Sequence, residues 1–191
     1  RTMKNVRAIR GLALTSLASL GLIAVTPAFA ESQFVSSPSP TTANARLNFQ
    51  VNVPRFLEFR VGSADAVIDT VVFDVAAADV GNATAVAGDI TVDVALRGNG
   101  GAISLSADTS ADPLNSGADT IPFSAISTNV DAGTINAPTL VDGASAPVAV
   151  AVTSGTRVTN RSATWSYEFD NAAVYGAGTY AGQVVYTATM P

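Results

Sequence analysis

The sequence predicts an all-β protein, an antiparallel immunoglobulin-like β-sandwich of roughly seven to nine short strands. Three observations lead to this class. Apolar and polar residues alternate in several short segments, which is the period of a half-buried strand. Clusters of Gly, Asn, Asp and Ser separate these segments, and no stretch after residue 45 has a convincing helical period. A closed barrel is the competing arrangement.

The first thirty residues have the pattern of a secretory signal peptide, assigned to 1–30. A basic start containing Lys4, Arg7 and Arg10 precedes an apolar stretch over 12–25, and Ala28-Phe29-Ala30 fits a cleavage site. The apolar stretch is shorter than the roughly 20 residues that span a bilayer, so a retained membrane anchor is the weaker alternative. We therefore expect export, a transient periplasmic stage, and a mature protein that acts outside the cell or on its surface.

Composition after the leader excludes most enzyme classes. The chain has no histidine and no cysteine, and Lys4 is the only lysine. Ser–His–Asp and Cys–His nucleophiles, Schiff-base lysines and histidine or thiolate zinc sites are therefore impossible. The leader holds four of the ten basic residues and none of the fifteen acidic ones, so the mature net charge is −9. We expect no enzyme activity, no cofactor, no nucleic-acid partner and no membrane association of the mature form.

The next two segments are a flexible leader and a strand. Residues 31–44 are rich in Ser, Pro and Thr and cannot bury enough apolar surface to fold alone. Residues 45–53 alternate strictly, with Leu47, Phe49, Val51 and Val53 on one face, and Pro54 ends the run. Such a strand can complete its own sheet, or it can be lent to the open sheet edge of a neighbour.

Residues 54–191 are expected to form the β-sandwich domain. Residues 90–107 are predicted to be a β-hairpin, because Ile90–Leu96 and Ile103–Ala107 alternate on either side of Gly98-Asn99-Gly100-Gly101. Residues 76–88 and 108–119 are predicted to be loops. The remaining expected strands are 55–61, 67–75, 121–126, 134–140, 148–152, 163–169 and 180–190.

Three residue sets are candidates for ligand or catalytic sites. A calcium loop would use Asp108, Asp112, Asn115 and Asp119, but the spacing does not fit the EF-hand, and such residues are common in turns. Carboxylate catalysis is disfavoured, because the acidic residues fall on polar strand faces or beside turns, where solvation explains them. A sugar-stacking platform is weaker than core packing for the late aromatic residues, which are Trp165, Tyr167, Tyr175, Tyr180 and Tyr186.

Several runs resemble the major pilins of alpha-class, colonization-factor-type fimbriae. One run near the C-terminus is similar to their closing strand: Gly176-Ala177-Gly178-Thr179-Tyr180-Ala181-Gly182-Gln183-Val184-Val185-Tyr186-Thr187-Ala188-Thr189. The run Leu47-Asn48-Phe49-Gln50-Val51-Asn52-Val53-Pro54 resembles their N-terminal donor strand, and Ile103-Ser104-Leu105-Ser106-Ala107-Asp108 resembles a central strand. Like those pilins, the chain has no cysteine.

The resemblance implies a structural subunit of a surface filament. A periplasmic chaperone would hold the exported subunit, and an outer-membrane usher would polymerise identical subunits head to tail. Residues 45–53 would be the donor strand, and 179–190 would form one wall of the acceptor groove. The sandwich would be incomplete until that strand is supplied. The alternative is a self-complemented β-sandwich module that binds carbohydrate or a surface partner. The implied subunit interface comprises Leu47, Phe49, Val51, Val53, Tyr180, Val184 and Tyr186.

Overall fold

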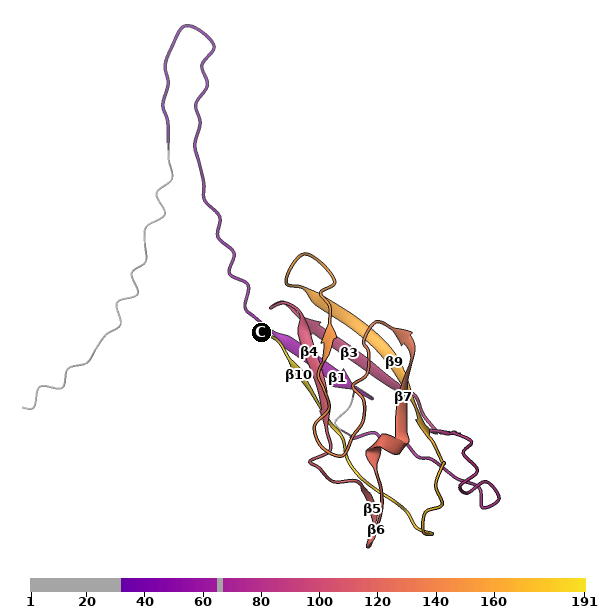
Figure 1. Ribbon diagram of the computed structural model, residues 1–191. Helices are drawn as coiled ribbons and strands as arrows, with labels where there is room; N and C mark the ends of the chain where they lie inside the picture. The colour runs from indigo at the N-terminus through magenta and orange to yellow at the C-terminus, as the bar shows by residue number, and fades with distance from the viewer. Residues whose placement is uncertain (1–31, 65–66) are drawn as a thin grey trace, which may run out of the picture. The chain divides into compact units, whose positions relative to one another are not determined.

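A computed structural model of the chain describes residues 32–64 and 67–191, so the expected signal peptide lies outside the described residues. Residues up to Asn52 separate from a compact unit formed by Val53–Pro191 (Figure 1). The compact unit is all-β, and every strand pair in it is antiparallel. Among the described residues no helix is long and apolar enough to cross a membrane.

The first sheet is five-stranded and is organised around the long strand β9 (Thr159–Phe169). Strand β3 (Val92–Gly98) lies between β9 and β1 (Leu57–Val61). On its other edge β9 pairs with β7 (Ile126–Gly133). The short β2 (Val86–Ala87) pairs with Glu168 and Phe169 on the same edge of β9 as β3, beyond the end of β3, because β9 is longer than β3. The order β1-β3-β9-β7 therefore crosses this sheet from one edge to the other.

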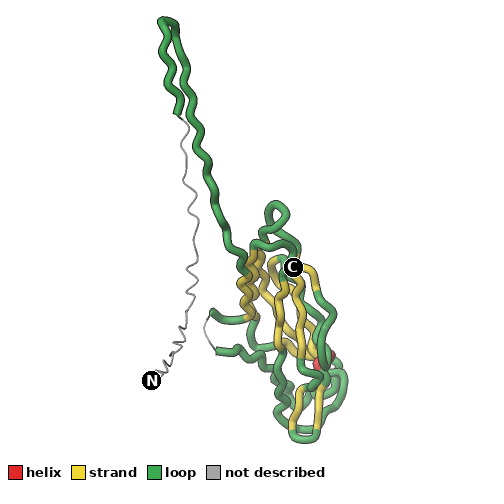
Figure 2. Tube along the Cα trace, turned by 90° about the vertical axis from the view of Figure 1, so that its left-hand side faces the viewer, coloured by secondary structure: helices red, strands yellow, loops and turns green. Residues whose placement is uncertain are grey.

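The second sheet has three strands, with β4 (Ile103–Asp108) between β10 (Val185–Thr189) and β8 (Val148–Val150). A small hairpin of β5 (Leu114–Ser116) and β6 (Asp119–Ile121) follows β4. It pairs with the chain entering β10 through the Asn115–Ala181 bridge. A single 3-10 turn, Phe123–Ala125, precedes β7, and loops make the other connections in the described part of the chain (Figure 2).

The core forms where the alternating apolar faces of the central strands meet. Leu96 on β3, Leu105 on β4 and Trp165 on β9 are each 0% exposed. The indole Nε1 of Trp165 donates a hydrogen bond of 2.9 Å to the carbonyl oxygen of Ile135, so the one polar atom of this ring is satisfied inside the core. Two antiparallel sheets that share one core are consistent with the predicted β-sandwich.

The predicted hairpin over 90–107 is wrong. Its two strands exist as β3 and β4, but they belong to different sheets and do not pair with each other. The glycine-rich turn at Gly98–Gly101 carries the chain from one sheet to the other. Both strands present fully buried apolar faces, and facing sheets bury such faces better than neighbouring strands of a single sheet would.

The remaining strand predictions meet mixed outcomes. Residues 67–75 form no strand where they are described, yet Val71, Phe73 and Val75 are half-buried against the core, as their alternation predicted. Residues 134–140 also form no strand, but Ile135 and Leu140 are buried. Burial therefore followed the apolar pattern, whereas ladder hydrogen bonds depended on whether a neighbouring strand was available.

Candidate functional site

Each sheet ends in strands with one unpaired edge: β7 and β8 on one side of the two sheets, and β1 and β10 on the other. On this second side β1 is the terminal strand of the first sheet, and β10 is the terminal strand of the second. Their ends converge on one turn, since a Cβ at Gly98 would lie 2.9 Å from the Met190 sulfur and 3.3 Å from the Phe56 carbonyl oxygen. We call the side flanked by β1 and β10 the open side (Figure 1).

The apolar faces of these edge strands are less covered than those of the central strands. Phe59 and Val61 on β1, and Tyr186 and Ala188 on β10, are half-buried although they pack against the core. Met190 lies at the end of the same row, and its sulfur accepts a hydrogen bond of 3.1 Å from the Gly100 amide. The open side therefore combines partly exposed apolar side chains with strand edges that could pair with a further strand.

The predicted strand 45–53 is extended, but it forms no strand and pairs with no described segment. Its apolar face is exposed: Leu47 by 66%, Phe49 by 87%, Val51 by 83% and Val53 by 73%. A strand forms only where its backbone joins a ladder, so alternation alone does not make one. Four large apolar side chains exposed together on one face are unusual in a folded protein and are typical of a binding segment.

The three residues predicted on the acceptor side all lie on or before β10. Val184 and Tyr186 are half-buried against the core, and Tyr180 lies at the start of the segment. The hydroxyl of Tyr186 is 3.1 Å from that of Tyr167, and the rings of Tyr186 and Trp165 are 5.5 Å apart. Burial raises the pKa of both tyrosines, so their hydroxyls keep their protons at alkaline pH values where an exposed tyrosine loses its own.

The calcium candidates do not form one site. Asp108 accepts a hydrogen bond of 2.7 Å from the Ser110 amide and so serves the local turn. Asn115 and Asp119 lie on β5 and β6, where backbone pairing fixes them in the hairpin. No group of three or more His, Cys, Asp or Glu side chains suited to a metal occurs among the described residues. The loop therefore offers single turn-capping carboxylates.

The aromatic residues divide into core and surface members. Trp165 and Tyr167 are buried, which excludes them from a sugar platform. Tyr175 and Tyr180 are half-buried and meet edge to face with ring centroids 6.3 Å apart. The Tyr180 hydroxyl donates a hydrogen bond of 2.8 Å to the carbonyl oxygen of Gly176, which is the pattern of a tyrosine corner. Tyr180 thus fixes the turn that leads into β10.

Comparison with known proteins adds no relative. No family model, no curated protein and no solved structure matches this chain. The functional conclusion therefore depends on the chain's own residues and geometry. The family resemblance predicted an acceptor groove with 179–190 as one wall, but it did not identify β1 as the edge strand across from β10, because strand neighbours across two sheets are not encoded in any local period.

Proposed function

We propose that this protein is an exported structural subunit of a surface filament that polymerises by donor-strand exchange. Residues 45–53 of one copy fill the open side of the next copy, and each added copy presents its own open side. Two observations together carry this proposal: the chain has an exposed apolar segment of strand period, and its domain leaves β1 and β10 with unpaired edges and half-buried apolar faces. A periplasmic chaperone and an outer-membrane usher are the partners that such a subunit requires.

The strand order supports a sandwich that lacks its last strand. Constant-type immunoglobulin domains order four strands A-B-E-D in one sheet and C-F-G in the other. Here β1-β3-β9-β7 corresponds to the first sheet, and β4-β10 corresponds to C-F. The place of strand G, beside β10, is the unpaired edge. The Tyr180 hydrogen bond lies in the connection between β9 and β10, where the tyrosine corner of that fold occurs.

The energetics favour filling that place. Burying the four apolar side chains Leu47, Phe49, Val51 and Val53 contributes up to about 6–12 kcal/mol in transfer terms, an upper bound. Backbone pairing along β10 adds hydrogen bonds, and alternate side chains enter the open side. Because donor and acceptor surfaces differ, the contact is head to tail and does not close on itself, so repetition builds a fibre.

The direction of the donor follows from the same correspondence. Strand G is antiparallel to F, so residues 45–53 would run against β10. The last donor residue, Val53, would then lie near Ala181, where the chain enters β10. Pro54 and Arg55 follow at once and lead into β1 at Leu57 of the donor's own domain. Consecutive domains are therefore joined by a very short connection.

The test is size exclusion at several concentrations with negative-stain electron microscopy and binding of a fluorescent peptide of residues 45–53. We expect SDS-resistant ladders or filaments, and peptide binding in competition with them. Phe49→Asp in the chain should abolish the ladders and filaments, and the same change in the peptide should abolish its binding, because a charge would enter an apolar groove. Gln50→Asp is the matched control, since its side chain lies on the opposite face of the donor. A monomer at every concentration that also fails to bind the peptide would overturn the proposal.

A carbohydrate-binding module is the second candidate, favoured by the half-buried pair Tyr175 and Tyr180 beside Asp119. Aromatic rings with a neighbouring carboxylate suit sugar rings and hydroxyls. A glycan-array signal that is lost in Tyr175→Ala, with an unchanged melting temperature, would favour this function. The absence of any glycan signal, together with peptide-dependent assembly, would leave the filament subunit.

A further inference from the structure

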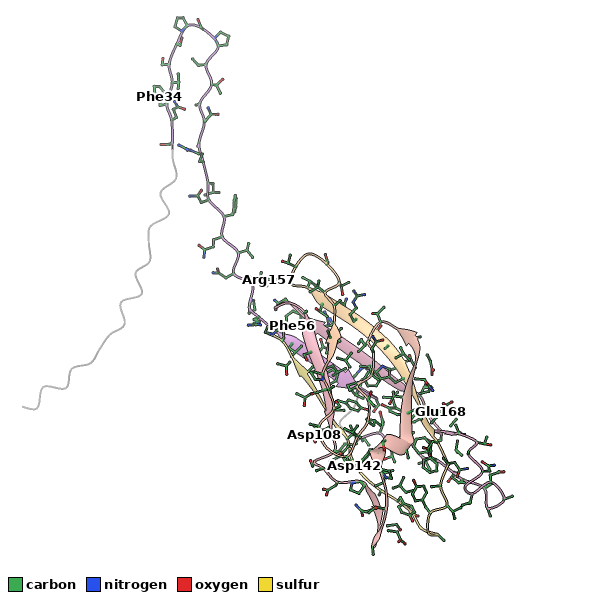
Figure 3. The ribbon with its side chains drawn as sticks, in the orientation of Figure 1. Phe34, Phe56, Asp108, Asp142, Arg157 and Glu168 are labelled. Carbon is green, nitrogen blue, oxygen red and sulfur yellow. The ribbon has the colours of Figure 1, made fainter. Side chains whose placement is uncertain are left out.

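Arginines gather at one end of the compact unit. Strand pairing brings the start of β1, the turn after β3 and the start of β9 together at this end. The pairs that do so are Leu57↔Gly98, Gly98↔Thr159 and Ile103↔Val150. We call this the arginine end, because it carries Arg55, Arg97, Arg157 and Arg161. The acidic side chain of Glu58 lies at the same end. Arg157 lies there in Figure 3, near Phe56.

Aspartates gather at the opposite end. Strand pairing also brings together the segments at this end, which we call the aspartate end. The pairs are Ile126↔Phe169, Val185↔Asp108 and the Asn115–Ala181 bridge. Figure 3 shows Asp108, Asp142 and Glu168 away from Arg157. Arg60 pairs with Ala95 in the middle of β1, so it belongs to neither end. The exposed carboxylates of the aspartate end include Asp74, Asp79, Asp108, Asp112, Asp119 and Asp170.

Two of the four arginines are already engaged within the chain. Arg97 forms an ion pair of 3.1 Å with Glu58, and Arg161 donates to the carbonyl oxygens of Ala151 and Val152. Arg55 and Arg157 have no hydrogen-bonded or ion-paired side-chain partner among residues 32–64 and 67–191. They line one depression of about 580 Å³, whose other lining residues are Val53, Asn99, Gly100, Thr156 and Pro191. This depression therefore presents two guanidinium groups to a partner.

We propose that Arg55 and Arg157 of one copy dock on the aspartate end of the neighbouring copy, close to Asp119. This inference rests on the proposed function and adds a second contact to strand exchange. A donor that runs antiparallel to β10 ends beside Ala181, and Asp119 lies near that point, because a Cβ at Gly176 would be 2.9 Å from its carboxylate oxygen. The arginine end of the donor's own domain begins two residues later.

The alternative donor direction brings like charges together. If residues 45–53 ran parallel to β10, Val53 would lie at the acceptor's own arginine end, and Arg55 would face Arg157 of the other copy. Complementary charges across an interface speed association and suppress wrong orientations, more than they add affinity. The junction between subunits therefore selects the antiparallel orientation and accelerates docking, and added salt weakens it.

The experiment measures association of two fluorescent peptides with the full chain by stopped flow. Both peptides span residues 45–57, and one carries Arg55→Glu. At low salt we expect the native peptide to associate at least about threefold faster. The difference should disappear in high salt and in Asp119→Asn. Asp93→Asn is the matched control, because it removes the same charge from the middle of the sheet, where Asp93 accepts a hydrogen bond from Thr164.

The outcomes separate the inference from the function on which it rests. Equal association of the two peptides, at unchanged final affinity, would overturn the charged junction and leave strand exchange standing. Failure of both peptides to bind would overturn strand exchange itself. If the native peptide still associated faster than the Arg55→Glu peptide with the Asp119→Asn chain, and both peptides still bound, the proposal that Arg55 docks on the aspartate end would also be overturned. A variant that loses its fold is recognised by its melting temperature, and Asp112→Asn then replaces it as the acceptor-side change.

For whole chains the same inference predicts charge-swap rescue. The double variant Arg55→Glu, Arg157→Glu makes both ends of a copy acidic. The double variant Asp112→Arg, Asp119→Arg instead adds arginines to the aspartate end. Each double variant alone should assemble more slowly than the native chain, by about tenfold in light scattering. An equimolar mixture should recover, because the two variants can alternate. Arg60→Glu, in the middle of β1, should leave the rate unchanged; an equal loss in Arg60→Glu would contradict the junction.

Discussion

The central strands and the edge strands of this domain share one sequence pattern but differ in coverage. Leu96 and Trp165, on β3 and β9, are fully buried because strands pair on both sides and a second sheet covers them. Phe59 and Tyr186, on β1 and β10, alternate in the same way and stay half-buried. The centre is therefore enclosed by paired strands and a facing sheet, whereas β1 and β10 each keep an unpaired edge and a half-buried apolar face.

The largest effect should come from the centre. Trp165→Ala removes a fully buried ring and its hydrogen bond to Ile135 and should cost about 3–5 kcal/mol of unfolding free energy. Val185→Ala is the edge comparison, since Val185 is 53% exposed, and it should cost less than about 0.5 kcal/mol. Thermal and urea unfolding of both variants measures the contrast. Similar losses would mean that the edge is packed as tightly as the centre.

Supplying the missing strand should give the next largest effect. A ligand that binds only the folded state adds about 2.7 kcal/mol of stability when present at 100 times its Kd. We therefore expect a peptide of residues 45–53 to raise the melting temperature of the full chain in a concentration-dependent way. The same peptide with Phe49→Asp should have no effect. A native peptide that never shifts the melting temperature would contradict an open acceptor side.

A pH series should report on the tyrosines at the boundary between centre and edge. Burial raises the folded-state pKa of Tyr167 and Tyr186 above the usual value of about 10. Above that pH the unfolded chain loses these protons while the folded chain keeps them. The contribution of these two hydroxyls to stability should therefore be constant below about pH 10 and fall as the pH rises further, by up to about 1.4 kcal/mol per pH unit for each tyrosine. Tyr167→Phe should flatten this slope, whereas an unchanged slope would mean that the hydroxyl is solvated.

Much of this architecture followed from sequence because burial obeys local alternation. The inward positions of β3, β4 and β9 all came from period-2 patterns, as did the half-buried face of Val71, Phe73 and Val75. The lack of histidine and cysteine in the sequence excludes histidine- and thiolate-based sites on residue type alone. Such inferences depend only on residue type and spacing.

Pairing could not be predicted in the same way. The turn at Gly98–Gly101 has the composition of a hairpin turn, yet it connects two sheets, because a glycine turn permits either path. The open side required knowledge of which strands end each sheet. The charged ends required the register, since Arg55 and Arg157 are distant in sequence and meet only through β3. These features arise from long-range contacts.

The smallest effect should come from the turn that positions the open edge. Tyr180→Phe removes only the hydroxyl that donates to Gly176 and should cost about 1 kcal/mol. Because Tyr180 precedes β10, the loss should be felt along the acceptor edge, so peptide binding should weaken in parallel with stability. Tyr175→Phe keeps the edge-to-face contact and is the matched control. If Tyr180→Phe lowered stability without changing peptide affinity, the corner would support the central strands alone, and the edge would be positioned by its pairing with β4.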